Sequence, residues 1–413
     1  MRLIYIFAFV LLYGSFGQSK NLRKSPLTAP IRVRLLRAQR AIEMDGFDLR
    51  FDGDSLSTSV LPIHSTVEIS RLRSEWFIRK NHRVWRAHGQ SLVVSGEMLE
   101  FEKNLQPPAT YVLEARSNAS FDVVADLRRK VYLEGVLPSE MPITWPVAAL
   151  EAQAVASISY ARAQALRHEQ SGFDVDSSIN SQVFNWSSYT RALTRERRKL
   201  AHVLAITRGQ ILINKRGQPY LAYFDSDCGG VTELAQNVWA RPGDPTGSKK
   251  IVHHFSKKGI VYDQYCLLNP HNRWHYFVTW RQIQRAVRGE FHNFRGEVRN
   301  VKVVSRSPSG RAYQVEVVAV NGRQLLMLSQ IFRQLIGYGR IRSTLFKIKH
   351  FRNGLEFDGR GFGHGVGMCQ HGARFMALNG ATYQQILSRY YPEARLINSR
   401  VHSAPISVIA SSE

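Results

Sequence analysis

The sequence has few cysteines and only one long apolar run. Only three of its 413 residues are cysteine, which is too few for a fold held together by a disulfide framework. Beyond the N-terminal segment, no stretch approaches the roughly 18 consecutive apolar residues that a transmembrane helix needs. These absences exclude a small disulfide scaffold and a protein with several membrane-spanning helices.

Acidic residues are also scarce relative to basic ones. The chain has 32 Asp and Glu against 56 Lys and Arg, and its formal net charge is +24. Such an excess favours an anionic partner, which could be nucleic acid, a membrane surface or an acidic polysaccharide. The charge alone does not choose among them, and basic patches such as 71–86 are equally typical of a solvated face. The length and the 44% hydrophobic content suit two or three globular domains.

The first residues have the layout of a secretory signal. Arg2 precedes an apolar run over 3–13, and the small residue Gly17 follows. We therefore expect a signal peptide over 1–18, with an uncleaved membrane anchor as the alternative. Export to the periplasm or the cell envelope argues against nucleic acid as the partner, and it favours a polymer of the envelope.

The pattern along the rest of the chain predicts an α+β protein. A basic linker over 19–30 precedes a region of alternating apolar and polar residues over 31–120, which predicts a β-rich unit. Helical and strand-like patterns are mixed over 121–397, which we expect to form the main domain. The composition of 398–413 is typical of a flexible tail.

Several elements of the main domain are predicted individually. An alanine-rich helix is expected from Pro146, a residue suited to the first helical position. Two hairpins are expected, with turns at 215–218 and 308–310. The last helix is expected to begin after Thr382, a suitable N-cap, and to end before Pro392.

Glu140 is the first candidate for chemistry. It is the only ionisable residue between Gly135 and Leu150, on a proline-rich stretch that we expect to connect two helices. If apolar neighbours cover the carboxyl group, desolvation raises its pKa and keeps it protonated, as protonation of a glycosidic oxygen requires. The alternative is a helix-capping or surface glutamate. No strong second carboxylate is evident nearby, so a single acid would suit a reaction in which the substrate supplies its own nucleophile.

The stretch GRGFGHGVGMCQHG, residues 359–372, has glycine at every second position for nine residues. This spacing differs from the dinucleotide-binding pattern G-x-G-x-x-G. On an extended segment it would leave one face as bare backbone, open to another strand or to a flat ligand, with His364 on the opposite face. The alternative is tight strand packing around a core histidine.

The cysteines leave three alternatives open. Cys228, Cys266 and His271, together with Asp225 or Asp263, could bind zinc, although their spacing matches no zinc signature. A Cys228–Cys266 disulfide is the second alternative. Two unpaired buried thiols are the third.

Three motifs, in order, resemble the stage II sporulation protein D family, also called the SpoIID/LytB domain. They are VLPSEMPITWPVAALEAQAVASISYA around Glu140, FDSDCGGVTELAQNVWA around Cys228, and GRGFGHGVGMCQHGARFMALNGATYQQILSRYYPEARL from Gly359. The resemblance extends over residues 120–396. It implies a SpoIID-like α+β fold, with twisted antiparallel sheets, packed helices and a central substrate cleft.

The resemblance also implies an activity. Members of the family are lytic transglycosylases that act on peptidoglycan glycan strands from which an amidase has removed the peptides. By position, Glu140 would protonate the oxygen between N-acetylmuramic acid and N-acetylglucosamine. It would then accept the proton of the muramic acid's primary hydroxyl as the anhydro ring closes. The alternatives are a non-catalytic glycan-binding protein or amidase enhancer, and a hydrolase that releases reducing ends.

The resemblance places further residues at the glycan and raises the question of a metal. The predicted substrate-binding residues are His364, Gln370, Gly363, Gly365, Tyr160 and Thr232. No cofactor is required, and the partners expected are glycan strands and a cell-wall amidase. Some members bind zinc near the second motif, where this chain has Asp225 and Asp263 at positions of metal ligands. Elsewhere it has Ile158 in place of the family's arginine and Cys369 in place of a serine.

Overall fold

The computed structural model describes residues 29–53, 56–61, 64–168, 171–179, 181–239 and 259–399. The predicted signal peptide, nearly all of the basic linker and nearly all of the predicted tail lie outside the described residues. Within the described ranges, no helix is both long enough and apolar enough to cross a membrane.

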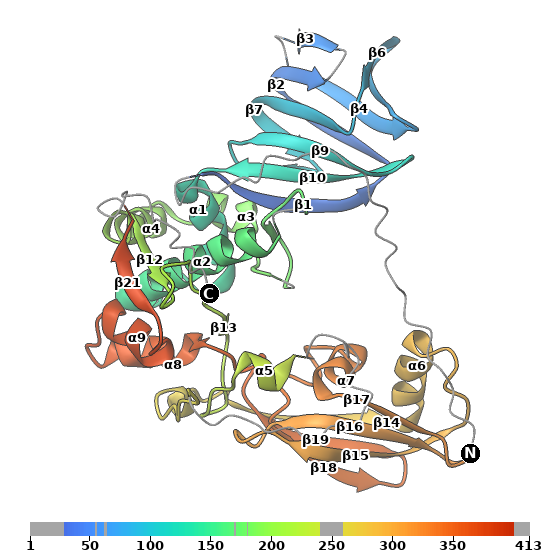
Figure 1. Cartoon of the computed structure of the whole chain (residues 1–413), viewed down its shortest axis with the longest axis vertical. Coiled ribbons are helices and arrows are strands. Elements are labelled where there is room, and N and C mark those ends of the chain that lie inside the picture. The colour runs from blue at the N-terminus through green and yellow to red at the C-terminus, as the bar shows by residue number, and fades with distance from the viewer. Residues whose placement is uncertain are drawn as a thin grey trace, which may run out of the picture.

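The largest sheet is built mainly from the first third of the chain, and Figure 1 shows its strands twisting across one end of the molecule. Its strand order is β11-β1-β10-β9-β7-β2-β4-β5-β6, with β3 on β2 and β8 on β7. Its strands are β1 (Ile31–Gln39), β2 (Ala41–Gly53), β3 (Leu56–Leu61), β4 (Ser65–Leu72), β5 (Glu75–Lys80), β6 (Arg83–His88), β7 (Ser91–Phe101), β8 (Asn104–Leu105), β9 (Thr110–Ser117), β10 (Ser120–Leu127) and β11 (Val175–Asp176).

Alternation of apolar and polar residues explains these strands. In β4 every second side chain is buried, which is the two-residue period of a strand with one face against a core. All pairings in this sheet are antiparallel except that of β1 with β11, which is parallel. Because β11 follows the alanine-rich helix that begins after Pro146, this edge of the sheet is completed by chain from the main helical region.

Helices pack beside this sheet and between it and a second group of strands (Figure 1). The longest is α2, whose small side chains are buried on nearly every face, as the alanine-rich sequence predicts. The helices are α1 (Arg129–Glu140), α2 (Val147–Arg167), α3 (Trp186–Thr190), α4 (Thr194–Ile206), α5 (Ala235–Val238), α6 (Trp280–Glu290), α7 (Ser329–Ile336), α8 (Gln370–Leu378) and α9 (Tyr383–Tyr390), together with the short 3-10 helix η1 (Cys266–Leu268).

The later strands form four smaller sheets. Their pairings are β12-β21, parallel β13-β20, β14-β19-β18 and β15-β16-β17. The strands are β12 (Gln210–Ile213), β13 (Phe224–Asp225), β14 (Arg273–Thr279), β15 (Val298–Arg306), β16 (Ala312–Ala319), β17 (Gln324–Leu328), β18 (Phe346–Phe351), β19 (Gly354–Arg360), β20 (Met368–Cys369) and β21 (Arg395–Asn398).

Two hydrophobic cores stabilise these layers. The first joins the large sheet to α1, α2, α4, α8 and α9. The second lies between α6 and α7 and the two three-stranded sheets. The α+β class, with largely antiparallel sheets and packed helices, is thus confirmed.

Most of the individually predicted elements are also confirmed. The hairpin with its turn at 308–310 is β15-β16. Thr382 caps α9, because its hydroxyl accepts a hydrogen bond from the amide of Gln385. The hairpin expected around 215–218 forms only beside its turn, where Ile213 pairs with Pro219 in an antiparallel bridge and the Tyr220 amide donates to the Leu212 carbonyl. Along its whole length β12 pairs with β21 from the C-terminal end.

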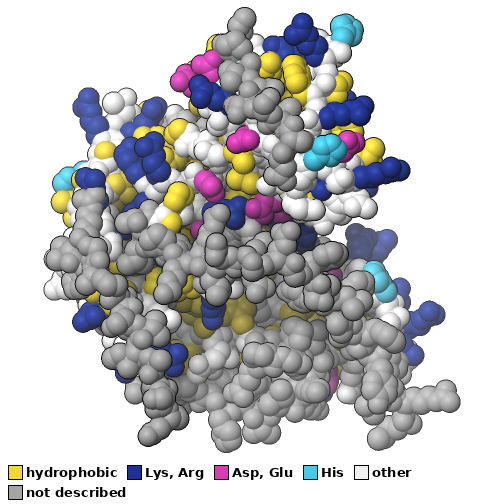
Figure 2. Space-filling model, turned by 45° about the horizontal axis from the view of Figure 1, so that its top comes forward, with side chains coloured by type: hydrophobic (Ala, Val, Ile, Leu, Met, Phe, Trp, Pro, Cys, Tyr) yellow, Lys and Arg dark blue, Asp and Glu magenta, His cyan; other side chains and the backbone are white. Residues whose placement is uncertain are grey.

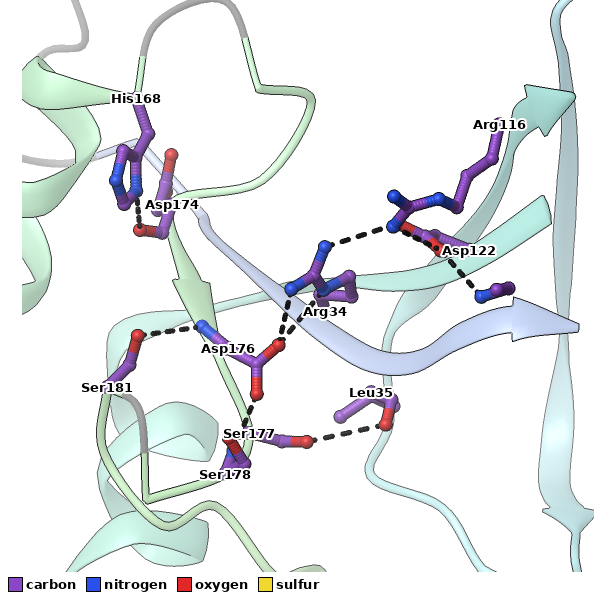
Figure 3. A network of polar contacts seen from close by, with 11 residues as sticks. Arg34, Leu35, Arg116, Asp122, His168, Asp174, Asp176, Ser177, Ser178 and Ser181 are labelled. Carbon is purple, nitrogen blue, oxygen red and sulfur yellow. Dashed lines mark hydrogen bonds and ion pairs between the residues drawn. The ribbon is translucent and has the colours of Figure 1, made fainter. Parts of the chain in front are cut away.

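A polar network ties the large sheet to the chain that follows α2 (Figure 3). The guanidinium group of Arg34 donates twice to Asp176, at 2.7 and 3.0 Å, and lies 3.4 Å from Asp122. The Asp176 carboxylate also accepts from the amide of Ser178 at 2.9 Å. The edge strand β11 is therefore held by charged hydrogen bonds as well as by the sheet ladder.

We expect Asp176→Asn to lower the melting temperature by about 2–4 °C at pH 7, since a charged hydrogen bond contributes about 1–2 kcal/mol. Burial alone would raise the pKa of Asp176, but hydrogen bonds from Ser178 and Arg34 lower this pKa below its ordinary value of 3.8. The ionised form therefore stabilises the fold above pH 3.8, and this stability is lost as the pH falls through the lower folded-state pKa.

The measurement is thermal unfolding of both proteins between pH 7 and pH 3. Glu68→Gln is the control, because Glu68 forms an exposed ion pair with Arg79 and should contribute little. Equal melting temperatures for Asp176→Asn and the wild type at pH 7 would contradict this account of the network.

Candidate functional site

Glu140 is the last residue of α1, so the prediction that it lies on a connection between two helices is wrong. Pro138 lies inside the helix, and Met141, the residue after Glu140, already has an extended backbone. The side chain of Glu140 is half-buried. Its position at a helix end leaves the carboxyl group free to meet groups from other parts of the chain.

Two groups contact the carboxyl group of Glu140. Its Oε1 accepts a hydrogen bond from the backbone amide of Val183 at 2.7 Å, and its Oε2 lies 3.4 Å from the Nε2 of Gln370. Burial raises the pKa of Glu140 above its ordinary value of 4.5, and these two hydrogen bonds offset only part of the increase. The site therefore favours the protonated acid more than water does.

The Val183 amide is positioned by the loop that follows β11. Gln182 is buried; it accepts a hydrogen bond from the Tyr132 hydroxyl and donates to the Ser157 carbonyl at 3.2 Å. Next to it, the ring of Phe184 lies against Gly135 of α1, where an added Cβ would come within 2.3 Å of the ring. The loop is therefore anchored on both sides of the amide that reaches Glu140.

Gln370 brings the third motif to the first. It is the first residue of α8 and 4% exposed. Besides Glu140, its Nε2 lies 3.5 Å from the side-chain oxygen of Gln153 on α2. Of the residues predicted to bind substrate, Gln370 is the one that the structure places against the predicted acid.

The alternating glycines do not form the regular extended segment that the sequence analysis expected. Gly361, Gly363, Gly365 and Gly367 all have positive φ, between +77° and +135°, a range that favours glycine. An added Cβ would come within 2.6 Å of Asp225 at Gly363 and within 1.9 Å of the Tyr223 carbonyl at Gly367. The space beside Gly363 and Gly367 is therefore occupied by the segment 223–229, which packs directly on their backbone.

His364 lies in an aromatic environment. Its ring centroid is 5.1 Å from that of Trp239 and 6.3 Å from that of Tyr223, and its Nδ1 accepts a hydrogen bond from the Val366 amide. Desolvation, followed by the charges of Arg333 and Arg311, lowers the pKa of His364 to about 3. The imidazole is therefore neutral near pH 7 and can accept or donate a hydrogen bond without carrying charge.

Tyr223 is a common neighbour for two further residues that were predicted to bind substrate. The ring of Tyr160 packs edge-on at 5.7 Å from that of Tyr223. Thr232 and Tyr223 both line a pocket of about 750 Å³, together with Gly367 and residues of α2 and α9. Glu140 is not among the residues that line this pocket, so the pocket is distinct from the immediate surroundings of the acid.

The three cysteines are buried and free, so the alternative of a Cys228–Cys266 disulfide is wrong, and the alternative of unpaired buried thiols agrees with the structure. Cys228, Cys266, Cys369 and Asp263 instead form a group whose ligand atoms all lie within 4.8 Å of one another. His271, predicted as a ligand, is outside this group. Cys369 was not predicted as a member of it; its place directly before Gln370 in the third motif is the only sequence signal for it.

The basic side chains that lie around Trp145 were not predicted. Trp145 lies five residues after Glu140 in the sequence; its ring centroid is 4.9 Å from that of His371 and 5.2 Å from the guanidinium carbon of Arg374. The Lys199 ammonium group donates to the Trp145 carbonyl. More widely, Figure 2 shows Lys and Arg side chains spread over the visible described surface and not gathered in one patch.

With this geometry in place, comparison with known proteins identifies the family. The family described as "Stage II sporulation protein" (SpoIID) matches residues 117–213, which include Glu140. A domain of unknown function (DUF8618) matches residues 210–367, which include Cys228 and His364. The chain belongs to the SpoIID family.

Individual relatives match about two thirds of this chain. An uncharacterized protein of Brachyspira hyodysenteriae is 30% identical over 283 residues, which is 66% of this chain and 68% of the relative. Stage II sporulation protein D of Bacillus subtilis is 28% identical over 65% of this chain and 74% of its own length. The amidase enhancer of Bacillus subtilis is 26% identical over 64% of this chain, and the match spans only 40% of the relative.

Gly365 offers a test of the close packing beside the site. An added Cβ would come within 2.3 Å of the Arg311 guanidinium group, which donates to the carbonyls of Cys228 and Val231. We expect Gly365→Ala to cost about 1–2 kcal/mol for its positive φ and about 1–3 kcal/mol more for displacing a buried hydrogen-bonded group. Thermal or chemical unfolding measures this loss.

Gly322→Ala is the matched control. Its φ is +79°, close to the +81° of Gly365, but an added Cβ would meet nothing within 4 Å. Gly322→Ala should therefore be destabilised only by the strain of a non-glycine residue at positive φ. If the two variants are equally stable, Arg311 does not constrain the glycine segment.

Proposed function

We propose that this protein is an exported lytic transglycosylase of the cell wall, which cleaves peptide-free peptidoglycan strands. The observation that carries the proposal is the Glu140 carboxyl group, half-buried, with a raised pKa, between the Val183 amide and Gln370. A general acid must hold a proton at the operating pH and present it to the leaving oxygen. Membership of the SpoIID family supports the same role.

In the proposed reaction, Glu140 acts twice. It first donates its proton to the oxygen that links N-acetylmuramic acid to N-acetylglucosamine, as that bond breaks. The resulting carboxylate is stabilised by the hydrogen bonds from Val183 and Gln370. It then accepts the proton of the muramic acid's own primary hydroxyl, whose oxygen bonds to the anomeric carbon and closes the anhydro ring. No second carboxylate and no water are needed.

The charge of the protein supports this substrate class. Removal of the peptide exposes a lactyl carboxylate on each muramic acid, so that a peptide-free strand is a polyanion. The net charge of +24 would attract such a strand, less strongly at high salt. Arg374 and Lys199, both in contact with Trp145, would supply positive charge for the lactyl groups.

A second candidate is a protein that binds glycan and stimulates an amidase without cutting the strand. The similarity to an amidase enhancer favours it, as does Ile158, which stands where the resemblance leads us to expect arginine. A hydrolase that releases reducing ends is the third. Product analysis separates all three.

We expect the wild-type protein, incubated with peptide-free glycan strands, to release products whose masses correspond to anhydro ends. Glu140→Gln should lower their rate of formation at least about 100-fold, because general acid–base catalysis contributes a factor of that order or more. Glu151→Gln is the matched control: Glu151 is also buried with a raised pKa, but the ionisable groups that interact with it are His202 of α4 and Tyr383 of α9, and not Gln370.

Mass spectrometry of the products decides the outcome. Anhydro products that disappear in Glu140→Gln but persist in Glu151→Gln support the transglycosylase. Reducing-end products would instead establish a hydrolase. If the wild type retains strand binding but shows no turnover, the enzymatic proposal fails in favour of the binding protein.

The raised pKa also predicts a stability change. Since the folded-state pKa of Glu140 lies above its ordinary value of 4.5, its stabilising contribution is full below pH 4.5 and is lost as the pH rises through the folded-state pKa. Glu140→Gln removes the cost of burying a charge, so it should melt at a higher temperature than the wild type at pH 7.5. This gain should shrink toward pH 4.5.

Differential scanning calorimetry at both pH values measures the effect. Gln can still offer a carbonyl oxygen to the Val183 amide, so the variant preserves the main hydrogen bond. A Glu140→Gln protein that is less stable than the wild type at pH 7.5 would show that the carboxyl group is not desolvated.

A further inference from the structure

Residues 273–360 form a unit of their own between the second and third motifs. Its two three-stranded sheets, together with α6 and α7, enclose the second hydrophobic core. Figure 1 shows this unit at the opposite end of the molecule from the large sheet. The unit lies outside the residues that match the SpoIID family, so membership of that family assigns it no part in the function.

This unit carries half of the protein's net charge. It has 17 Lys and Arg against 5 Asp and Glu, a formal net charge of +12 in about a fifth of a chain whose total is +24. Of these basic side chains, all but Arg311 and Arg333 are exposed. An anionic partner is therefore attracted to this end of the molecule as well as to the site around Glu140.

A groove of about 630 Å³ lies between the two sheets of the unit. Its walls come from β15 and β18, each of which is an edge strand of its own sheet. The ring of His350 joins the two strands at one point, where its Nε2 lies 2.9 Å from Asn300 Oδ1 and 3.3 Å from the Val301 carbonyl oxygen. Edge strands leave backbone groups unpaired, so this β15–β18 groove can offer hydrogen bonds to the hydroxyl and amide groups of a ligand.

Aromatic rings border the β15–β18 groove. Phe351 is 48% exposed, and its ring centroid lies 5.9 Å from that of Phe277, which is 38% exposed. Trp280, the first residue of α6, also lines the groove, and its Nε1 donates to the Arg352 carbonyl at 3.1 Å. Exposed aromatic rings beside polar groups suit the apolar C–H faces of sugar rings.

Two arginines complete the lining of the groove. The register of β15 against β16 shifts between Val298 and Asn300, so Arg299 is the extra residue of a β-bulge, a feature that re-aims a side chain. Arg352 lies in the two-residue turn between β18 and β19. Both arginines are exposed, and among the described residues neither forms an ion pair. A free guanidinium group can hold a carboxylate by two parallel hydrogen bonds.

We propose that the β15–β18 groove binds a peptide-free glycan strand at a second point, apart from Glu140; the inference rests on the proposed function for its choice of ligand. Sugar faces would pack on Trp280 and Phe351, and lactyl carboxylates would pair with the two arginines. A strand held at two points stays at a high effective concentration near the acid while it is cut.

The charge of the groove favours this strand over nucleic acid. Peptide-free glycan carries one carboxylate for each disaccharide, whereas nucleic acid carries a phosphate on every nucleotide. Glu297 is the one acidic residue among those that line the groove, and its carboxylate disfavours a polymer with a charge on every unit. A sparsely charged strand can place its carboxylates at Arg299 and Arg352 and a neutral sugar beside Glu297.

Binding of fluorescently labelled peptide-free strands, followed by anisotropy, tests the proposal on the full chain with Glu140→Gln, so that no strand is cut. Adding Arg299→Gln together with Arg352→Gln should weaken binding at least about 10-fold, because two charged hydrogen-bonding groups are lost. Phe351→Ala should also weaken binding. Glu297→Gln should strengthen it, because a repulsive charge is removed.

Arg285→Gln together with Arg340→Gln is the matched control. It removes the same charge from exposed positions of the unit that do not line the groove, so it should weaken binding less than about 3-fold. Thermal unfolding should show that both double variants melt close to the parent protein, since the altered side chains are exposed. An equal loss of affinity in the two double variants would overturn the proposal, because the charge would then act without a site.

Two other anionic probes test the choice of ligand. If the groove variants lose affinity for a DNA duplex or for phosphatidylglycerol vesicles but bind glycan strands like the parent protein, the groove takes a different polyanion and the proposal is wrong. Unchanged binding of both probes, with weakened binding of the strands, supports it.

Kinetics with Glu140 intact separate this proposal from the proposed function. The groove variant should raise the KM for long strands and leave kcat unchanged, since it removes binding and no reacting group. If the wild type cuts no strands, the transglycosylase proposal fails, and the binding measurements still decide whether the groove holds glycan. A groove variant that lowers kcat with an unchanged KM would contradict a second binding site.

Discussion

The architecture around the candidate site depends on one desolvated carboxyl group held between two hydrogen-bond donors. Glu140 ends α1, Val183 belongs to the loop after β11, and Gln370 begins α8, so three distant segments must meet before the group acquires its environment. Desolvation favours the neutral form, while the two donors favour the charged form. An acid that must give up a proton and later take one back needs both influences.

Close backbone packing brings the third motif into place. Glycines at 361, 363 and 367 adopt positive φ and let the segment 223–229 lie directly on them, while Gly365 makes room for Arg311. That contact also sets Cys228 beside Cys369, and Cys369 precedes Gln370. The alternating-glycine segment, which the sequence suggested as an open binding surface, therefore packs against other parts of the chain. It affects the chemistry of the site through Cys369 and Gln370, the residues that follow it.

The sequence predicted regular elements well and contacts poorly, for physical reasons. Burial periodicity and capping chemistry are local, so α2, the β15-β16 hairpin and the Thr382 cap could all be anticipated. The Val183 amide could not, because a backbone donor leaves no residue-specific signal. The cysteine group was only half anticipated: Cys228 and Cys266 stood out, but the arrival of Cys369 depends on the β13-β20 pairing, which joins two-residue strands about 140 positions apart.

The protonation state of Glu140 is the most direct test of the account. Titration of ¹³C-carboxyl-labelled glutamate by NMR, with the Glu140 resonance assigned by its absence in a Glu140→Gln spectrum, gives its pKa in the folded protein. The account predicts a value clearly above the ordinary 4.5. A value at or below 4.5 would mean that the carboxyl group is solvated and ionised, and the general-acid role would be contradicted.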